Sequence, residues 1–394
     1  MKKVLLSLSM ALVLLSCNNS ENELTVTEAP ATYSFKRNGV TTVSYSGQTT
    51  RIAMGGEFVS ALSDNTQTTA SLSGKFAHVE GEADFTDADL NASSKSIRSK
   101  TAASTDFYSD NTADASIIKA QFDSWIAAQV NDVFPQWDED ASAGVAGGVL
   151  SADGTKTRYV NEKGLEYNQV INKGLIGGLM IDQIVNNYLS VAVLDAGDNI
   201  ANNDADILDG DNNYTTMEHK WDEAFGYLYG LEANATAPTL GNDSFLNKYL
   251  DRVDSDEDFT GIATDIYNAF KLGRAAIVNK DYTTRNEQAE ILREKLSIII
   301  GVRAVHYLQA GKDVLDSDKA AAFHDLSEGL GFVYSLQFTR KPNSTEPYLS
   351  KEEVDGFMTT LQAGNGFWDV TSTTLDDIST TIASKFSFTV AETH

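Results

Sequence analysis

The sequence predicts a mainly α protein, a duplicated helical bundle of two three-helix repeats with an extended N-terminal segment and C-terminal helices. Three observations predict this fold class. Apolar residues recur at helical spacing from about residue 113 onward. Of the five prolines, at 30, 135, 238, 342 and 347, those at 135, 238 and 342 bound two stretches of about 100 residues in which helices can run unbroken. The third observation is a motif that occurs twice.

The repeated motif is His-x-x-x-Glu-x-x-Gly-aromatic-aliphatic-Tyr. It begins at His219 and again, 105 residues later, at His324. Each copy follows a long predicted helix that carries glycine in its middle, and a shorter helix precedes that one. We interpret this order as one three-helix unit that occurs twice, with shorter loops in the second copy.

These patterns divide the chain into six regions. They are a lipoprotein signal peptide (1–16), a flexible spacer (17–30), an extended or irregular N-terminal segment (31–112), helical repeat 1 (113–238), helical repeat 2 (239–342), and C-terminal helices with a tail (343–394).

The N-terminal segment has little helical periodicity. Residues 31–53 alternate Thr, Val, Tyr and Phe with Gly, which predicts extended chain or a short hairpin. A brief helix is expected at about 56–62. Residues 63–112 are rich in Ser, Thr, Ala, Asp and Asn, and we expect a long, loosely structured excursion there.

The rest of the chain is predicted to be helical. The expected helices cover residues 113–130, 162–194, 214–231, 262–279, 285–310, 318–338, 350–362 and 370–385. Two of them begin with the spacing of a reciprocal capping box, Thr215 with Glu218 and Ser350 with Glu353.

The first residues resemble a lipoprotein signal. Lys2 and Lys3 precede an apolar run of about 12 residues that ends in Ser16-Cys17, and this run is too short for a permanent membrane span. The resemblance implies that Cys17 carries fatty acyl chains such as palmitate, and that the protein is an outer-membrane lipoprotein of the cell envelope. The alternative is an ordinary secretory signal in which Cys17 is incidental. Which face of the membrane the protein occupies stays open.

Composition excludes some classes of protein. With one cysteine, the chain has no disulfide scaffold and no Cys-based zinc or iron–sulfur site. Its formal net charge of −26 argues against a nucleic-acid partner, because phosphate backbones are bound by positive patches.

Helical spacing places His219, Glu223, Gly226 and Gly230 on one face of the first motif helix. It places Trp221, Phe225 and Leu228 on another face, which we expect in the core. In the second copy the shared face carries His324, Glu328, Gly331 and Ser335. Small residues below each polar pair would let another helix approach closely.

The two pairs have two interpretations. In the first, His219, Glu223, His324 and Glu328 converge as metal ligands, a set suited to iron, zinc or manganese. Glu218 and Asp222 would then support the ligands from the surrounding layer. In the second, each glutamate hydrogen-bonds a buried histidine and fixes helix packing, with no metal.

Two segments resemble a known family. Residues 214–227 (YTTMEHKWDEAFGY) and 45–54 (YSGQTTRIAM) resemble the motifs of a domain family of unknown function found in gram-negative lipoproteins. That family is similar to imelysin-like proteins, which are duplicated helical bundles with a Gly-x-His-x-x-Glu motif, associated with iron uptake. The chain departs from this motif: Met217 replaces the glycine, Asp222 and Ser327 occupy the third place after each histidine, and glutamate comes fourth.

The resemblance implies a non-catalytic, lipid-anchored envelope protein that assists iron or haem acquisition, with iron or another divalent metal bound at the His/Glu pairs. The competing hypothesis is a metal-free scaffold or binding lipoprotein that works beside an outer-membrane transporter or receptor. A metallopeptidase is the third class, and the His-Glu-x-x-His pattern of zinc peptidases is absent from the sequence.

Overall fold

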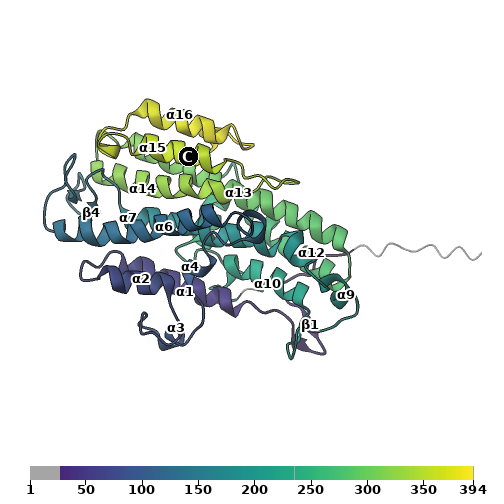
Figure 1. The fold of residues 1–394 in the computed structure, drawn as a ribbon. Coiled ribbons are helices and arrows are strands. Elements are labelled where there is room, and N and C mark those ends of the chain that lie inside the picture. Colours follow the sequence, from purple (N-terminus) through teal and green to yellow (C-terminus); the bar gives the residue numbers. More distant parts are fainter. Residues whose placement is uncertain (1–26, 235, 394) are drawn as a thin grey trace, which may run out of the picture.

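The structure is a computed structural model that describes residues 27–234 and 236–393. Those residues form layers of helices (Figure 1), with α1–α3 on one side and α15 and α16 on the opposite side. They contain 16 α-helical segments and two short antiparallel hairpins, so the prediction of a mainly α bundle is confirmed.

The N-terminal segment is more helical than predicted. Its elements are β1 (Lys36–Arg37), β2 (Val40–Thr41), α1 (Ser46–Ala61), α2 (Thr69–Ala77), α3 (Ala88–Asn91), α4 (Ile97–Lys100) and α5 (Thr105–Tyr108). The β1–β2 hairpin confirms the first part of the prediction for residues 31–53, but residues 46–53, also predicted to be extended, are helical. Helix α1, however, begins ten residues before the helix expected at 56–62.

The prediction of a loosely structured excursion over 63–112 is wrong. Its scattered apolar residues are anchors, because Leu72, Phe76 and Ile97 are all fully buried. Polar side chains that cap short helices hold the segment between these anchors. The reciprocal capping box of Thr68 and Ser71 starts α2. Single buried residues without periodicity give no helical pattern, which is why the sequence did not reveal these turns.

The first repeat contains three main helices, and the middle one is extended by π-helical turns. Its elements are α6 (Thr112–Ala128), β3 (Gly147–Leu150), β4 (Thr157–Val160), α7 (Tyr167–Leu175), α8 (Val191–Leu194), α9 (Asn199–Asp204) and α10 (Thr216–Tyr229). Helix α7 continues through π-helical turns at Ile176–Ile181 and Ile184–Tyr188. The helix expected over 162–194 is therefore shorter at both ends, since the β3–β4 hairpin precedes it and Ser190 begins a new helix.

The second repeat and the C-terminal helices agree closely with the predicted ranges. They are α11 (Leu246–Asp254), α12 (Ile262–Val278), α13 (Tyr282–Asp313), α14 (Lys319–Ser335), α15 (Lys351–Leu361) and α16 (Ser372–Ala383). Both predicted capping boxes are present, at the starts of α10 and α15. The sequence did not predict α11.

The two motif helices make the same aromatic contact, each with the first main helix of the other repeat. Tyr229 of α10 meets Phe270 of α12 edge to face, with ring centroids 6.1 Å apart and planes at 80°. Tyr334 of α14 meets Phe122 of α6 at 5.9 Å and 82°. The two tyrosines hold the same place in the repeated motif, so the packing supports the duplication inferred from the sequence.

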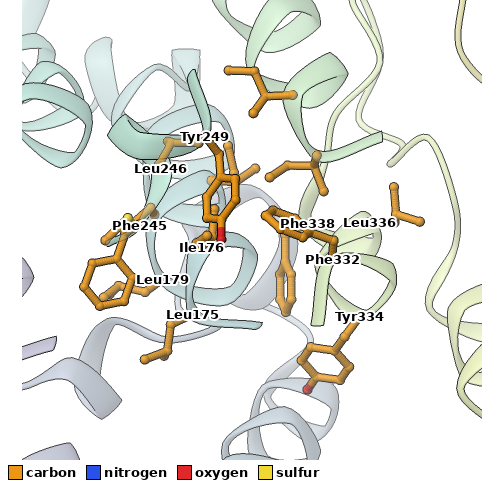
Figure 2. Close-up of a cluster of buried hydrophobic side chains, with 14 of the residues drawn as sticks. Leu175, Ile176, Leu179, Phe245, Leu246, Tyr249, Phe332, Tyr334, Leu336 and Phe338 are labelled. Atoms are coloured by element: carbon orange, nitrogen blue, oxygen red, sulfur yellow. The ribbon is translucent and has the colours of Figure 1, made fainter. Parts of the chain in front are cut away.

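A single hydrophobic core runs through the bundle. Figure 2 shows the part of it where α7, α11 and the end of α14 meet, with Ile176, Leu246 and Phe332 turned toward one another. All three are fully buried, as are Trp221, Phe225 and Leu228, which the motif predicted to be core.

The signal peptide, Cys17 and most of the spacer lie outside the described residues. The spacer's last part is held in place, because Thr27 Oγ1 donates to Asp281 Oδ2 at 3.0 Å. Among the described residues, no helix combines the length and the apolar character needed to cross a membrane.

Gly273 offers a test of this packing. A methyl group at Gly273 would stand 2.1 Å from the buried ring of Trp221, whose Nε1 donates to Phe270 O at 3.0 Å. We expect Gly273→Ala to lower the free energy of unfolding by about 1–3 kcal/mol in urea titrations. Gly56→Ala is the matched control, since a methyl group there meets nothing within 4 Å. Equal midpoints for the two variants would contradict the packing described.

Candidate functional site

The first motif helix holds the backbone at the start of α1. His219 Nδ1 donates to Ser44 O at 3.0 Å, because a carbonyl oxygen can only accept. Asp222 Oδ2 accepts from Ser44 N at 3.2 Å. The imidazole also stacks on Tyr214, with ring centroids 4.5 Å apart. Two side chains of the motif thus bind both backbone groups of one residue.

Glu223 and Gly226 continue the contact one turn further along α10. Glu223 Oε1 accepts from Gln48 Nε2 at 3.1 Å, and its Oε2 accepts from Lys220 Nζ at 2.7 Å. A methyl group at Gly226 would stand 2.4 Å from Cβ of Tyr45. The absence of a side chain at this position is what allows α1 to lie against α10.

The second motif helix holds α7 in the same way. His324 Nδ1 donates to Glu166 Oε1 at 3.1 Å, and Ser327 Oγ accepts from Glu166 N at 2.9 Å. Glu328 Oε1 lies 2.8 Å from Lys173 Nζ. A methyl group at Gly331 would stand 2.5 Å from Cβ of Lys173. In both copies the motif therefore binds the start and one face of an incoming helix.

The four predicted metal ligands do not converge as expected. His219 and Glu223 face α1, whereas His324 and Glu328 face α7. Within residues 27–234 and 236–393, no three His, Cys, Asp or Glu side chains are grouped to hold a metal ion. The alternative of a His–Glu hydrogen bond is not seen at His219 either, since its Nε2 lies 4.0 Å from Glu223 Oε2. Metal binding by either pair stays a prediction.

Glu218 and Asp222 belong to a buried ion cluster rather than to a layer around a metal. Arg274 of α12 donates from Nε to Asp222 Oδ1 at 3.0 Å and from Nη1 to Glu218 Oε1 at 3.1 Å. The Tyr33 hydroxyl donates to Asp222 Oδ1 at 2.6 Å. Arg274 and Asp222 are 0% exposed. The sequence held one signal for this cluster outside the motif, an arginine directly before the apolar run 275–278 of α12.

The cluster shifts the pKa values of its two carboxyl groups in opposite directions. Burial raises the pKa of Asp222 above its usual value, and the Arg274 charge only partly offsets this. Burial would also raise the pKa of Glu218. The Arg274 charge, the hydrogen bond from the Thr215 amide and the Arg37 side chain outweigh burial and hold that pKa below the usual range. Glu218 is therefore the carboxyl group of the two with the stronger preference for its charged form.

A groove opens beside this contact. Its volume is about 650 Å³, and we call it the hydroxyl groove. It is lined by Tyr33, Ser34, Thr41, Val43, Ser44, Tyr45, Ser46, Thr49, Thr50, Ala233, Asn234 and Thr236. None of these side chains is charged, in a chain whose formal net charge is −26. The groove thus presents hydroxyl groups, one amide and two phenol rings.

Comparison with known proteins gives one finding about relationship. The chain matches a family described as a domain of unknown function (DUF4856) over residues 30–389. No curated protein and no solved structure matches the chain.

Removal of the Arg274 charge should destabilise the folded protein. Arg274→Met would leave Asp222 buried without a cation and Glu218 with Arg37 as its only cation, and we expect the free energy of unfolding to fall by about 3–5 kcal/mol. Lys295→Met is the control, because the pair of Lys295 with Asp265 is exposed and should contribute less than about 1 kcal/mol. Urea titrations of both variants measure this, and equal effects would refute a stabilising role for the cluster.

Glu328 should contribute a pH-dependent part of the stability. Burial acts to raise its pKa, but Lys173 and His324 outweigh this and lower the pKa to about 2. Because the folded-state pKa is lowered, the Glu328 carboxylate stabilises the protein at pH values above its ordinary pKa of about 4.3. This stabilisation is lost as the pH falls toward 2. We therefore expect the stability difference between wild type and Glu328→Gln to be largest near neutral pH and to shrink between about pH 4.5 and pH 2.

Denaturant titrations at a series of pH values measure this difference. Glu352→Gln, at an exposed position of α15, controls for the general loss of a negative charge. A wild-type advantage over Glu328→Gln that stays constant down to pH 2 would contradict the ion pair with Lys173.

Proposed function

The chain belongs to the DUF4856 family, and we propose that it is a lipid-anchored, non-catalytic binding protein of the cell envelope. It works beside an outer-membrane transporter or receptor and holds a cargo for uptake. The observation that supports the binding role is the hydroxyl groove. The lipid on Cys17 and the cargo class, iron or haem, rest on the sequence resemblance to lipoproteins and imelysin-like proteins.

The lining of the hydroxyl groove suits binding better than catalysis. Hydroxyl groups and the Asn234 amide donate and accept hydrogen bonds, and the half-buried Tyr45 ring offers an apolar surface. Burial raises the pKa of both phenols, so they stay neutral. General acid–base catalysis, and the activation of a serine or threonine hydroxyl as a nucleophile, use a carboxylate, imidazole or amine, and none of these is among the described residues that line the groove.

The groove is also held in a fixed shape. Its wall residues Ser44 and Tyr45 are the ones that His219, Asp222 and Gly226 fix against α10. Thr49, also in the lining, is fixed by its Oγ1, which donates to Gly230 O at 2.8 Å. A preformed site loses little conformational freedom on binding, which favours affinity. A volume of about 650 Å³ lies in the range of small-molecule and cofactor sites.

The cargo should enter as a preformed complex. Because the four predicted ligands do not converge, we propose that iron arrives already chelated or as haem, and that the protein recognises the organic surface of the complex. Hydroxyl groups and phenol rings match such a surface, which combines polar edges with flat apolar faces. This is the binding-lipoprotein hypothesis from the sequence, with the cargo class taken from the resemblance.

A groove-filling variant tests this function. Thr50 lines the groove and donates to Ser46 O one turn back, so we expect Thr50→Trp to weaken binding of haem or of a ferric hydroxamate chelate at least tenfold. Thr359→Trp is the matched control, because Thr359 is exposed on α15 and donates to Asp355 O in the same way. Fluorescence titration of the mature protein measures both dissociation constants.

Two outcomes would contradict the proposal. One is the absence of binding of either compound to the wild-type protein. The other is an equal dissociation constant for wild type and Thr50→Trp, which would place the cargo outside the groove.

A further inference from the structure

A second cavity, of about 420 Å³, lies between α11 with its following loop and α13. We call it the Arg303 cavity. Its lining includes Lys248, Arg252, Ser255, Asp256, Arg303 and Tyr307, none of which lines the hydroxyl groove. Unlike the hydroxyl groove, it is rich in cationic side chains.

Arg303 is buried without a counter-ion. Its side chain stacks on two phenol rings, with Cζ 4.5 Å from the ring centroid of Tyr307 and 5.5 Å from that of Tyr249. The residue is 8% exposed, and its Nε is fully buried with no hydrogen-bond partner. Within the described part of the chain, no ion pair engages its guanidinium group. Burial of an unpaired charge is unfavourable, so this arrangement calls for an anion.

The nearest buried carboxylate already has a cation. Glu328 Oε1 lies 2.8 Å from Lys173 Nζ and accepts from the Tyr249 hydroxyl at 3.4 Å. Its charge is thus neutralised by a lysine on α7. Glu328 therefore does not need Arg303 as a second cation. The Nη donors of Arg303 remain for a ligand in the cavity that it lines.

The remaining charges of the cavity are positive in sum. Lys248 and Arg252 are four residues apart on α11, and neither forms an ion pair with any described residue. Asp256 is the one carboxylate of the lining, and its Oδ1 accepts from Asp258 N at 3.1 Å. Three cations and one carboxylate give a net charge of +2. His306 also lines the cavity, with Nδ1 donating to Thr393 O at 2.7 Å.

The adjacent acidic residues do not change this sum. Asp254 turns to the start of α12, where its Oδ1 accepts from Gly261 N and Ala263 N at 3.0 and 2.9 Å. Neither Asp254 nor Glu257 nor Asp258 lines the cavity. A local excess of positive charge in a chain of net charge −26 is a specific feature of this site.

We propose that the Arg303 cavity binds a phosphate group as its dianion, carried by a small organic molecule or a lipid headgroup. The planar guanidinium fork of Arg303 matches two phosphate oxygens, and Lys248 and Arg252 supply the flanking charges. A dianion balances the net charge of +2. The volume leaves room for an organic substituent beyond the phosphate. This site is independent of the proposed cargo groove.

Isothermal titration calorimetry tests the proposal. Inorganic phosphate and glycerol phosphate are each titrated into the purified full-length mature protein at constant ionic strength. We expect Arg252→Ala, a change at an exposed position, to weaken binding about tenfold, the effect of losing one charge-assisted hydrogen bond. Arg303→Met should weaken binding by at least tenfold, and Arg303→Lys less, because lysine keeps the charge and loses the fork. Lys295→Met, also on α13, should bind as wild type.

Vesicle flotation distinguishes the two sources of the phosphate group. Binding to phosphatidic acid vesicles, but not to phosphatidylcholine vesicles, and its competition by inorganic phosphate would identify a lipid headgroup. Binding of soluble phosphate compounds without vesicle binding would identify a soluble ligand.

The proposal is overturned if inorganic phosphate, glycerol phosphate and phosphatidic acid vesicles all fail to bind. It is equally overturned if Arg252→Ala and Arg303→Met, each folded by circular dichroism, bind phosphate as tightly as wild type. Neither result would affect the titration of haem or chelate at the hydroxyl groove.

Discussion

The arrangement of the bundle depends on two close helix–helix approaches. Helix α1 reaches α10 at Gly226, and α7 reaches α14 at Gly331, at separations that would place a methyl group 2.4–2.5 Å from the partner's Cβ. At each approach a histidine and the residue three places later bind the start of the incoming helix, and a glutamate binds a side chain on its face. The repeated motif is thus a helix-docking device, and the hydroxyl groove is formed where the first docking takes place.

The Arg274 cluster makes the first docking specific. One guanidinium group joins α12 to α10 through Glu218 and Asp222, and Asp222 also binds Tyr33 and Ser44 of the N-terminal segment. Because a buried carboxylate without a partner is costly, alternative positions of the segment are disfavoured. The second copy has Ser327 in place of Asp222, and its neutral hydroxyl accepts from Glu166 N and donates to Phe323 O. The two copies therefore keep the same geometry with different chemistry.

The sequence predicted most of the helical fold, because long helices with periodic apolar residues and capping boxes leave a clear pattern. It failed over 63–112, where single anchors such as Leu72 and Ile97 are buried without any period. For the candidate site, the motif drew attention to residues that contact incoming helices, but it did not predict their partners. Residues that share a helix face can turn toward each other or toward other helices, and spacing alone does not separate these cases. Arg274 and Arg303 were missed because neither belongs to the repeated motif, and each has partners on other helices.

The central claim is that each motif docks its own incoming helix, and amide hydrogen exchange measured in Gly226→Ala and Gly331→Ala tests it most directly. A methyl group at Gly226 should reduce protection at Ser44 and the first turns of α1, and leave α7 protected. A methyl group at Gly331 should reduce protection at Glu166 and the first turns of α7, and leave α1 protected. Unchanged protection in both variants, or the same pattern of loss in both, would contradict the claim.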